Sequence, residues 1–246
     1  MSWTRPILAT LRNDGLRLAR DRFLLGTTLY VLAIAVAMRW LVPWLQAELL
    51  ARHDVDISPW VGLGMSYFVV INTSVLTGVI GGMLLVEARE ERTVEALLVT
   101  PTPMWLPLAT LSAVITAIGA AMTMALSVLI GVGTPGSSAT LAAAVIGAPT
   151  GVVIAMLVAT VASNKVEAFA IMKVASFLGL LPVAGYFLPE PAQYIVGLVP
   201  PYWACKLWWM GVAGETGWAW LIAPGAVVSA LWIGILVHRF RAVVQR

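Results

Sequence analysis

Six long apolar segments set the strongest limit on how this chain can fold. A helix needs about 20 mostly apolar residues to cross a bilayer, and each of these segments is long enough. Hydrophobic residues make up 60% of the 246-residue chain, and the mean hydropathy of +0.92 excludes a soluble domain. We therefore predict one all-α integral membrane domain, residues 1–246, with six transmembrane helices: Phe23–Leu45, Val61–Val86, Trp105–Val132, Ala139–Ala162, Ala168–Leu188 and Trp218–His238.

The distribution of Lys and Arg predicts the orientation of this domain. Cytoplasmic loops carry an excess of these residues, and with the N-terminus inside, eleven of the 15 basic residues fall on the inner side. Arg52 and Lys206 fall outside, and Arg39 and Lys173 lie within spans. Both termini are therefore predicted to be cytoplasmic. The same bias accounts for the net charge of +3, so no nucleic-acid partner is expected.

Tryptophan supports the same orientation, because its ring prefers the headgroup layer of a membrane. Trp3 and Trp105 mark the predicted inner boundary. The predicted outer boundary is marked by Trp40, Trp44, Trp60, Trp203, Trp208, Trp209, Trp218 and Trp220.

The link between the second and third spans concentrates charge in a chain that is only 11% charged. Each charge near the bilayer centre costs about 2.5–3.5 kcal/mol, so we expect this link to lie in water. Its charged residues are Glu87, Arg89, Glu90, Glu91, Arg92 and Glu95.

A short surface helix is predicted within this link. After Thr93, the apolar residues Val94, Leu97 and Leu98 have the spacing of one helical face, and Thr100-Pro101 ends the pattern. If the second span continues as a helix, Glu87, Glu91 and Glu95 form a column of like charges. A basic partner surface would relieve the repulsion within that column.

Two further segments are expected at the membrane surfaces. Thr4–Arg22 is predicted as an interfacial helix on the inner leaflet; a basic leader that only sets the topology is the alternative. On the outer side, Gln193–Val199 and Tyr202–Val212 are each too short to span, and Pro200-Pro201 separates them. Two short re-entrant helices covered by protein fit this pattern; an aromatic loop resting on the headgroups is the alternative.

A few polar residues lie inside the predicted spans. Asn72, Thr73, Ser74 and Thr77 cluster in the second span, where they can hydrogen-bond a neighbouring helix or contact substrate. Lys173 either snorkels to the inner surface or lines a polar path, and Arg39 lies near enough to the outer surface to snorkel.

Small residues in the spans predict close helix packing. Gly78 and Gly82 form one pair with four-residue spacing, and Gly147 and Gly151 form another. Such pairs let helix backbones approach closely. We expect this packing to occur within one subunit.

Several chemistries have no basis in this sequence. It contains no G-x-x-x-x-G-K-[ST] loop for ATP phosphates. His53 and His238 belong to opposite membrane faces, and Cys205 is the single cysteine. We therefore expect no enzymatic activity, no metal site, no catalytic residue and no cofactor bound by this chain.

The segment Glu87 to Pro101, together with the predicted topology, resembles the permeases of type-2 ABC exporters. The segment is similar to the family signature E-x-x-x-G-T-x-E-x-L-L-x-T-P through Thr93, Glu95, Leu97, Leu98, Thr100 and Pro101. Arg92 stands where the family has glycine, a departure that affects the geometry of the turn.

The resemblance implies a dimeric permease, homodimer or heterodimer, in a bacterial plasma membrane, driven by separate ATP-binding subunits that hold the ATP and Mg²⁺. Small bacterial permeases of this type include drug exporters, fluoroquinolone exporters among them; lipids, hydrophobic drugs and glycolipids all remain possible substrates. The resemblance places the coupling contact at Glu87, Glu90, Glu91, Arg92, Thr93, Glu95, Leu97 and Leu98, and a re-entrant element at Pro200, Pro201, Tyr202 and Trp203. The residues considered for lining the pathway are Asn72, Thr73, Thr77 and Lys173.

Two other functions remain open. A secondary transporter or channel would work without an ATPase and would be expected to carry a carboxylate within the membrane. Glu167 is the nearest candidate, and it lies at the inner boundary. A scaffold that assembles other membrane proteins is the second alternative.

Overall fold

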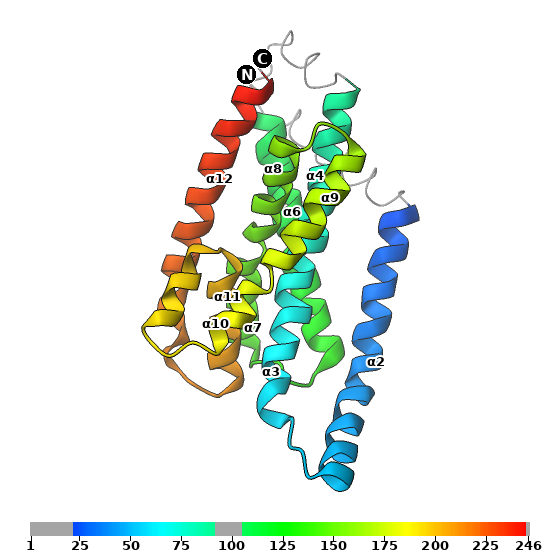
Figure 1. Ribbon diagram of the computed structural model, residues 1–246, viewed down its shortest axis with the longest axis vertical. Coiled ribbons are helices and arrows are strands. Elements are labelled where there is room, and N and C mark those ends of the chain that lie inside the picture. The colour runs from blue at the N-terminus through cyan, green and yellow to red at the C-terminus, as the bar shows by residue number, and fades with distance from the viewer. Residues whose placement is uncertain (1–21, 92–104, 245–246) are drawn as a thin grey trace.

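The computed structural model describes residues 22–91 and 105–244, and these residues form helices and turns without any strand. The predicted interfacial helix and most of the charged link lie outside this part of the chain. The helical elements form an elongated bundle (Figure 1). In chain order they are α2 Arg22–His53, α3 Ser58–Ser66, η1 Tyr67–Ile71, α4 Asn72–Glu90, α6 Trp105–Ile130, α7 Ser137–Gly147, α8 Pro149–Val161, α9 Lys165–Leu178, α10 Leu181–Tyr186, η2 Ala192–Leu198, α11 Pro201–Val212, η3 Gly217–Leu221 and α12 Ile222–Val244.

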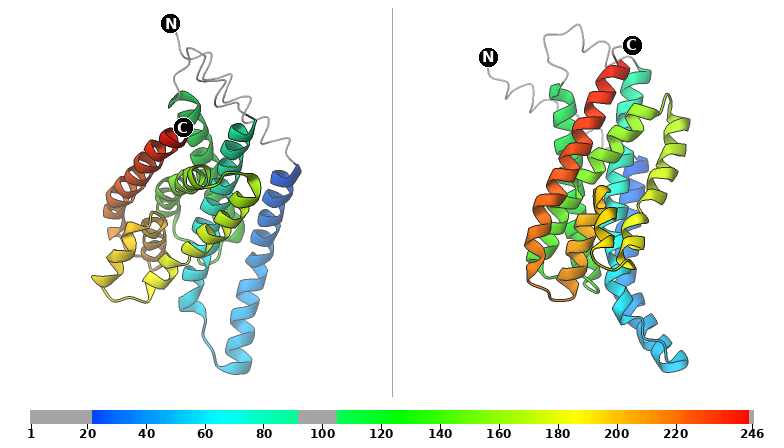
Figure 2. Two further views of the ribbon diagram at one scale, coloured as in Figure 1. Left: turned by 45° about the horizontal axis from the view of Figure 1, so that its top comes forward. Right: turned by 60° about the vertical axis from the view of Figure 1, so that its left-hand side comes forward.

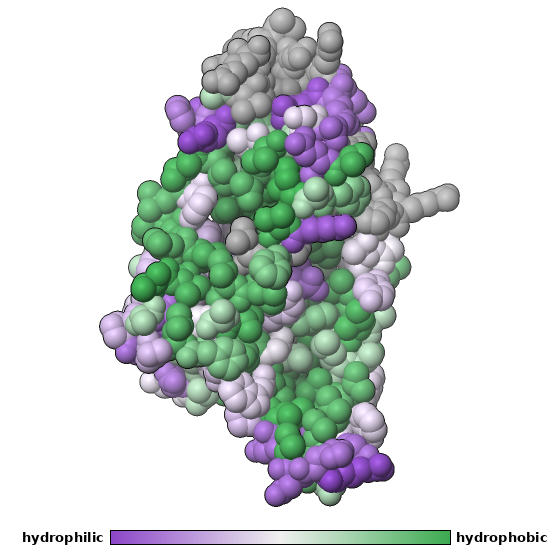
Figure 3. Space-filling view, viewed as in Figure 1, coloured by the Kyte–Doolittle hydropathy of each residue, from purple (hydrophilic) through white to green (hydrophobic). Residues whose placement is uncertain are grey.

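Five of the helical stretches are long and apolar enough to cross a membrane, which makes this a multi-pass membrane protein. They correspond to the first four predicted spans and the last one. Residues at both ends of the bundle are hydrophilic and a broad apolar belt lies between them (Figure 3). The five stretches are Leu25–His53, Ser58–Glu90, Leu106–Ile130, Ser137–Val161 and Gly217–Ala242.

The predicted fifth span, Ala168–Leu188, is not one helix. It divides into α9 and α10, with a turn at Gly179 and Leu180. Pro182 explains the break, because its ring lacks an N–H and would clash with the carbonyl of Leu178 in a continuous helix. Gly179 also costs about 1 kcal/mol relative to Ala in a helix. An uninterrupted helix in this region was therefore the wrong expectation.

The first span is longer than predicted. α2 continues to His53, so most of the expected loop 46–60 is helical and a short turn joins it to α3. Residues 46–53 include good helix formers, and Glu48 and Arg52 make an ion pair four residues apart. The end of α2 and the turn to α3 project beyond the rest of the bundle (Figures 1 and 2).

The most extensive helix contact joins α4 to α8. A Cβ added to Gly78 would lie 2.6 Å from Cβ of Ile154 and 2.7 Å from the carbonyl oxygen of Gly151. A Cβ added to Gly82 would lie 2.8 Å from Cβ of Val158. The predicted close packing within one subunit is therefore confirmed for Gly78 against Gly151.

The connections place several chain ends together. The beginnings of α2 and α6, the ends of α4 and α12 and the link between α8 and α9 lie toward the upper end of the bundle in Figure 1. The lower end carries the turns between α2 and α3 and between α6 and α7. In the latter turn, Gly131 and Gly133 have φ values of +65° and +63°, which residues with a Cβ rarely adopt.

Candidate functional site

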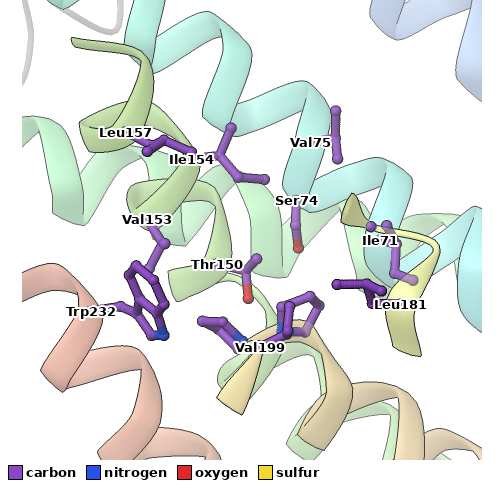
Figure 4. Close-up of a pocket in the computed structure, with 13 residues that line it drawn as sticks. Ile71, Ser74, Val75, Thr150, Val153, Ile154, Leu157, Leu181, Val199 and Trp232 are labelled. Carbon is purple, nitrogen blue, oxygen red and sulfur yellow. The ribbon is translucent and has the colours of Figure 1, made fainter. Parts of the chain in front are cut away.

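A cavity of about 170 Å³ lies where the broken helix meets α4, α8 and α12. It is surrounded almost entirely by apolar side chains. Figure 4 shows these side chains converging from separate elements of the bundle. The lining residues are Ile71, Ser74, Val75, Thr150, Val153, Ile154, Leu157, Gly179, Leu181, Val199, Pro200, Pro201 and Trp232.

Interruptions in regular helix structure create this cavity. Gly179 lies at the break between α9 and α10, and Val199 and Pro200 lie between η2 and α11. Ile71 is the last residue of the π-helical turn η1, which precedes α4. Such π-helical turns occur frequently at functional sites. The site is therefore formed by irregular backbone inside a bundle of regular helices.

Two hydroxyl groups provide the polarity of the cavity. Ser74 Oγ lies within hydrogen-bond distance of the carbonyl oxygens of Val70, at 2.8 Å, and Gly147, at 3.1 Å, which share its single hydroxyl proton. The second contact joins the helix α4 to α7. Thr150 Oγ1 is buried and has no hydrogen-bond partner among the described residues. Thr150 is therefore the polar group that this cavity leaves unsatisfied.

Trp232 forms the α12 side of the cavity. Its indole Nε1 donates a hydrogen bond of 2.9 Å to the carbonyl oxygen of Leu198, which fixes the ring against η2. The side chain keeps 40% of its surface exposed. Trp232 consequently presents a fixed aromatic surface at the edge of the cavity (Figure 4).

The residues predicted to line a pathway do not line this cavity. Thr73 and Thr77 are buried, and Thr77 Oγ1 donates to the carbonyl oxygen of Thr73 at 3.0 Å, within its own helix. Asn72 is half-buried, and Lys173 is exposed on α9. Their neighbour Ser74 is the member of the predicted polar cluster that reaches the cavity. A role in a pathway stays a prediction for Asn72, Thr73, Thr77 and Lys173.

The predicted re-entrant element contributes Pro200 and Pro201 to the cavity lining, whereas Tyr202 and Trp203 pack behind them in the core. Tyr202 Oη donates to Gln193 Oε1 at 3.1 Å, and Trp203 Nε1 donates to the carbonyl oxygen of Gly197 at 2.7 Å. These bonds tie α11 to η2. Insertion of this element into the membrane stays a prediction.

An ion pair joins α11 to the segment that precedes η2. Lys206 Nζ is 2.7 Å from Glu190 Oε1. The hydrogen bond and the charge of Lys206 lower the pKa of Glu190 below its usual value. The carboxylate is therefore charged at neutral pH. Its contribution to the stability of the fold is lost only as the pH falls through that lowered pKa.

The three described acidic residues of the predicted coupling contact lie at the end of α4. Glu87 and Glu90 belong to the last turn of the helix, and Glu91 follows it and is exposed. α4 thus continues beyond Val86 but ends at Glu90, so Glu91, the second member of the predicted charge column, lies just outside the helix. The remaining predicted contact residues lie outside the described residues: Arg92, Thr93, Glu95, Leu97 and Leu98.

Arg89 joins this end of α4 to α8. Its Nη1 donates hydrogen bonds to the carbonyl oxygens of Ala159, at 2.7 Å, and Ala162, at 3.1 Å. The last carbonyls of a helix lack intrahelical partners, and a positive charge there is favourable. Arg89 therefore caps the C-terminus of α8 and holds it to the end of α4.

Arg39 makes a similar but weaker contact. Its Nη1 donates to the carbonyl oxygens of Val128, at 3.5 Å, and Leu129, at 3.4 Å, near the end of α6. Arg39 is exposed. The contact places its charge at a helix C-terminus, which is where a cation is stabilised.

Replacing Arg89 with Gln should lower the free energy of unfolding by about 2 kcal/mol, because a charged hydrogen-bond donor is removed from partly buried carbonyls. Unfolding in mixed micelles, followed by circular dichroism, measures the loss. The matched control is Arg39→Gln, whose longer bonds at an exposed site should make its effect less than about 1 kcal/mol. Equal losses in the two variants would contradict the capping role of Arg89.

Three residues with a role at this site were not predicted from the sequence: Thr150, Trp232 and Arg89. Two signals were available for the break beside the cavity, since Gly179 and Pro182 lie inside the predicted fifth span. Trp232 lies inside the predicted last span, whereas tryptophan is usually enriched at the membrane boundaries. No signal identified Thr150, because its burial without a partner depends on tertiary packing.

Comparison with known proteins covers nearly the whole chain. A family model described as fluoroquinolones export permease protein Rv2686c-like matches residues 14–237. Two relatives in Mycobacterium tuberculosis are the fluoroquinolones export permease proteins MT2760 of strain CDC 1551 / Oshkosh and Rv2686c of strain ATCC 25618 / H37Rv. Each is 27% identical over 243 residues, which cover 97% of this chain and 95% of the relative.

Proposed function

The chain belongs to the Rv2686c-like family of fluoroquinolones export permease proteins, and we propose that it is the membrane subunit of an ATP-driven exporter of the ABC type. In this proposal it forms a dimer in a bacterial plasma membrane, with both termini in the cytoplasm. Two separate ATP-binding subunits, which hold the ATP and Mg²⁺, dock on the link after α4. The chain itself carries no catalytic residue.

The end of α4 is the observation that carries this proposal. Glu87, Glu90 and Glu91 follow directly on a stretch long enough to cross the membrane. Arg89 joins the same turn to α8, and α8 contributes Thr150, Val153, Ile154 and Leu157 to the cavity. A displacement of the acidic end would therefore move a wall of the cavity.

Coupling requires that ATP-driven closure of the partner subunits favour one state of the permease. The close contact between α4 and α8 supports transmission through a rigid unit, since Gly78 leaves no space for the helices to approach further. The exposed carboxylate of Glu91 would pair with basic residues of the ATP-binding subunit, together with the carboxylates of Glu87 and Glu90. Leu97 and Leu98 would enter an apolar groove on that subunit.

The substrate class follows from the relatives and from the cavity. The relatives are named for export of fluoroquinolones, and we extend to this chain a preference for amphipathic, ring-containing drugs. The apolar lining with the hydroxyls of Ser74 and Thr150 suits such molecules. A substrate with several charges would find no paired group in this lining.

A secondary transporter is less well supported. Glu167, the carboxylate considered for ion coupling, is exposed at the start of α9. Its Oε2 accepts a hydrogen bond of 2.7 Å from the backbone N–H of Ser163, and Asn164 Oδ1 accepts one of 2.9 Å from the N–H of Glu167. These contacts cap the N-terminus of a helix, which gives the carboxylate a structural role.

The double variant Glu91→Arg, Glu95→Arg tests the docking proposal. It should reduce capture of the ATP-binding subunit in detergent about tenfold, equivalent to about 1.4 kcal/mol, because like charges then face the basic partner surface. Capture is measured by quantitative pull-down with the purified partner. The control, Glu48→Arg with Glu215→Arg, makes the same change of charge elsewhere. Equal capture by all three proteins would reject the coupling role of Glu91 and Glu95.

A further inference from the structure

We propose that the cavity within each single subunit binds one aromatic ring that carries a hydrogen-bonding substituent, with Thr150 as the polar contact and Trp232 as the stacking surface. The inference rests on the proposed function for its physiological meaning, namely that the ring belongs to a transported drug. The binding event itself needs neither the ATP-binding subunits nor a second permease subunit.

The volume of the cavity limits the size of its occupant. An apolar protein cavity of about 150 Å³ stays dry and binds benzene. The cavity of about 170 Å³ in this protein therefore accepts a single ring with a small substituent. A larger drug would insert one ring and leave the rest of the molecule outside.

Thr150 determines the polarity of the occupant. The residue is 3% exposed, and its Oγ1 has no hydrogen-bond partner in the described part of the chain. A buried hydroxyl without a partner is unfavourable, and a ligand that supplies the partner removes this penalty. Figure 4 shows the Thr150 oxygen directed to the side of the cavity where Val199 lies, and the Ser74 oxygen pointing in the same general direction.

Trp232 favours an aromatic occupant. Its hydrogen bond to Leu198 holds the indole in place at the cavity edge, so little freedom is lost when a second ring packs against it. Aromatic pairs prefer offset-stacked or edge-to-face arrangements and gain more than the burial of their area alone. Val153 and Leu181 supply apolar contacts from the neighbouring sides.

A lipid acyl chain is the competing occupant. It has no polar atom, so it would leave Thr150 unsatisfied and would gain nothing specific from Trp232. The binding of an acyl chain should therefore not depend on the hydroxyl of Thr150, whereas the binding of an aromatic alcohol should. This difference provides the test.

The experiment compares two photoreactive probes, 4-azidophenol and phenyl azide, on the purified permease in nanodiscs. Mass spectrometry locates the labelled peptides, and titration gives the half-saturating probe concentration. Thr150→Val keeps nearly the same shape and removes the hydroxyl; it should raise the half-saturating concentration of 4-azidophenol about tenfold and leave that of phenyl azide unchanged. Thr123→Val is the control, a buried threonine of α6 away from the cavity.

The outcomes separate the possibilities. Saturable labelling of α8 and α12 by 4-azidophenol, lost with Val153→Trp, supports the site. Equal saturation by the two probes, with no effect of Thr150→Val, overturns the proposal, because binding in the cavity would then not depend on a hydrogen bond to Thr150. Because this binding is measured on the permease alone, the variant Glu91→Arg, Glu95→Arg should label normally. Normal labelling with unaffected partner capture would thus reject the coupling proposal and leave this site standing.

Discussion

Replacing Gly78 with Leu should lower the free energy of unfolding by about 3 kcal/mol or more, because overpacked helix contacts must separate. The first added carbon already lies 2.7 Å from the backbone oxygen of Gly151, and a backbone atom cannot move aside as a flexible side chain can. The rest of the leucine side chain would force α4 away from α8. Equilibrium unfolding in mixed micelles, followed by circular dichroism, measures this loss.

Gly64→Leu is the matched control for this variant. Gly64 belongs to α3, in the same helical stretch, and a Cβ added there meets no atom within 4 Å. The control should retain its stability or gain slightly, since leucine is a better helix former than glycine. If both leucine variants unfold alike, the α4–α8 contact is not the tight junction inferred from Gly78 and Gly151.

Replacing Trp208 with Ala should cost about 3–5 kcal/mol of unfolding free energy, the range for removal of a fully buried aromatic side chain. Trp208 has 0% of its surface exposed, and its Nε1 donates a hydrogen bond of 3.1 Å to the carbonyl oxygen of Gly133. The substitution therefore opens a cavity between α11 and its neighbours and removes a link to the turn after α6. Unfolding curves measured as for Gly78→Leu give the difference.

Trp44→Ala serves as the comparison for Trp208→Ala. Trp44 is 59% exposed on α2, so its removal should change the unfolding free energy by less than about 1 kcal/mol. A small effect of Trp208→Ala, similar to that of Trp44→Ala, would mean that α11 is not a structural part of the core.

The tryptophans illustrate what hydropathy can and cannot predict. Trp40, Trp44, Trp60 and Trp220 are exposed, as expected for side chains at a membrane boundary. Trp203, Trp208 and Trp209 come from the same predicted boundary but are buried, and each indole N–H has a protein partner. The sequence indicates that such rings prefer the boundary. It does not distinguish lipid headgroups from a covering of protein.

Glycine spacing was more informative than polar residues inside the spans. The pairs Gly78/Gly82 and Gly147/Gly151 predicted close helix packing, because the absence of side chains has one direct geometric consequence, and the structure brings Gly78 against Gly151. The hydroxyl groups of the polar cluster differ in their hydrogen bonding. Ser74 reaches a neighbouring helix, Thr77 donates to a carbonyl of its own helix, and Thr73 Oγ1 has no partner among the described residues. Hydroxyl groups have several ways to be satisfied, and local sequence does not choose among them.

Length and apolarity alone determined that this chain is an all-helical, multi-pass membrane protein, because a bilayer leaves the backbone few ways to satisfy its hydrogen bonds. Tertiary structure decided where the cavity lies, which hydroxyl faces it without a partner, and that Arg89 holds α4 to α8. Span formation depends on about 20 consecutive residues. The cavity depends instead on Ser74, Thr150 and Trp232, which are far apart in the chain and meet only when α4, α8 and α12 pack together.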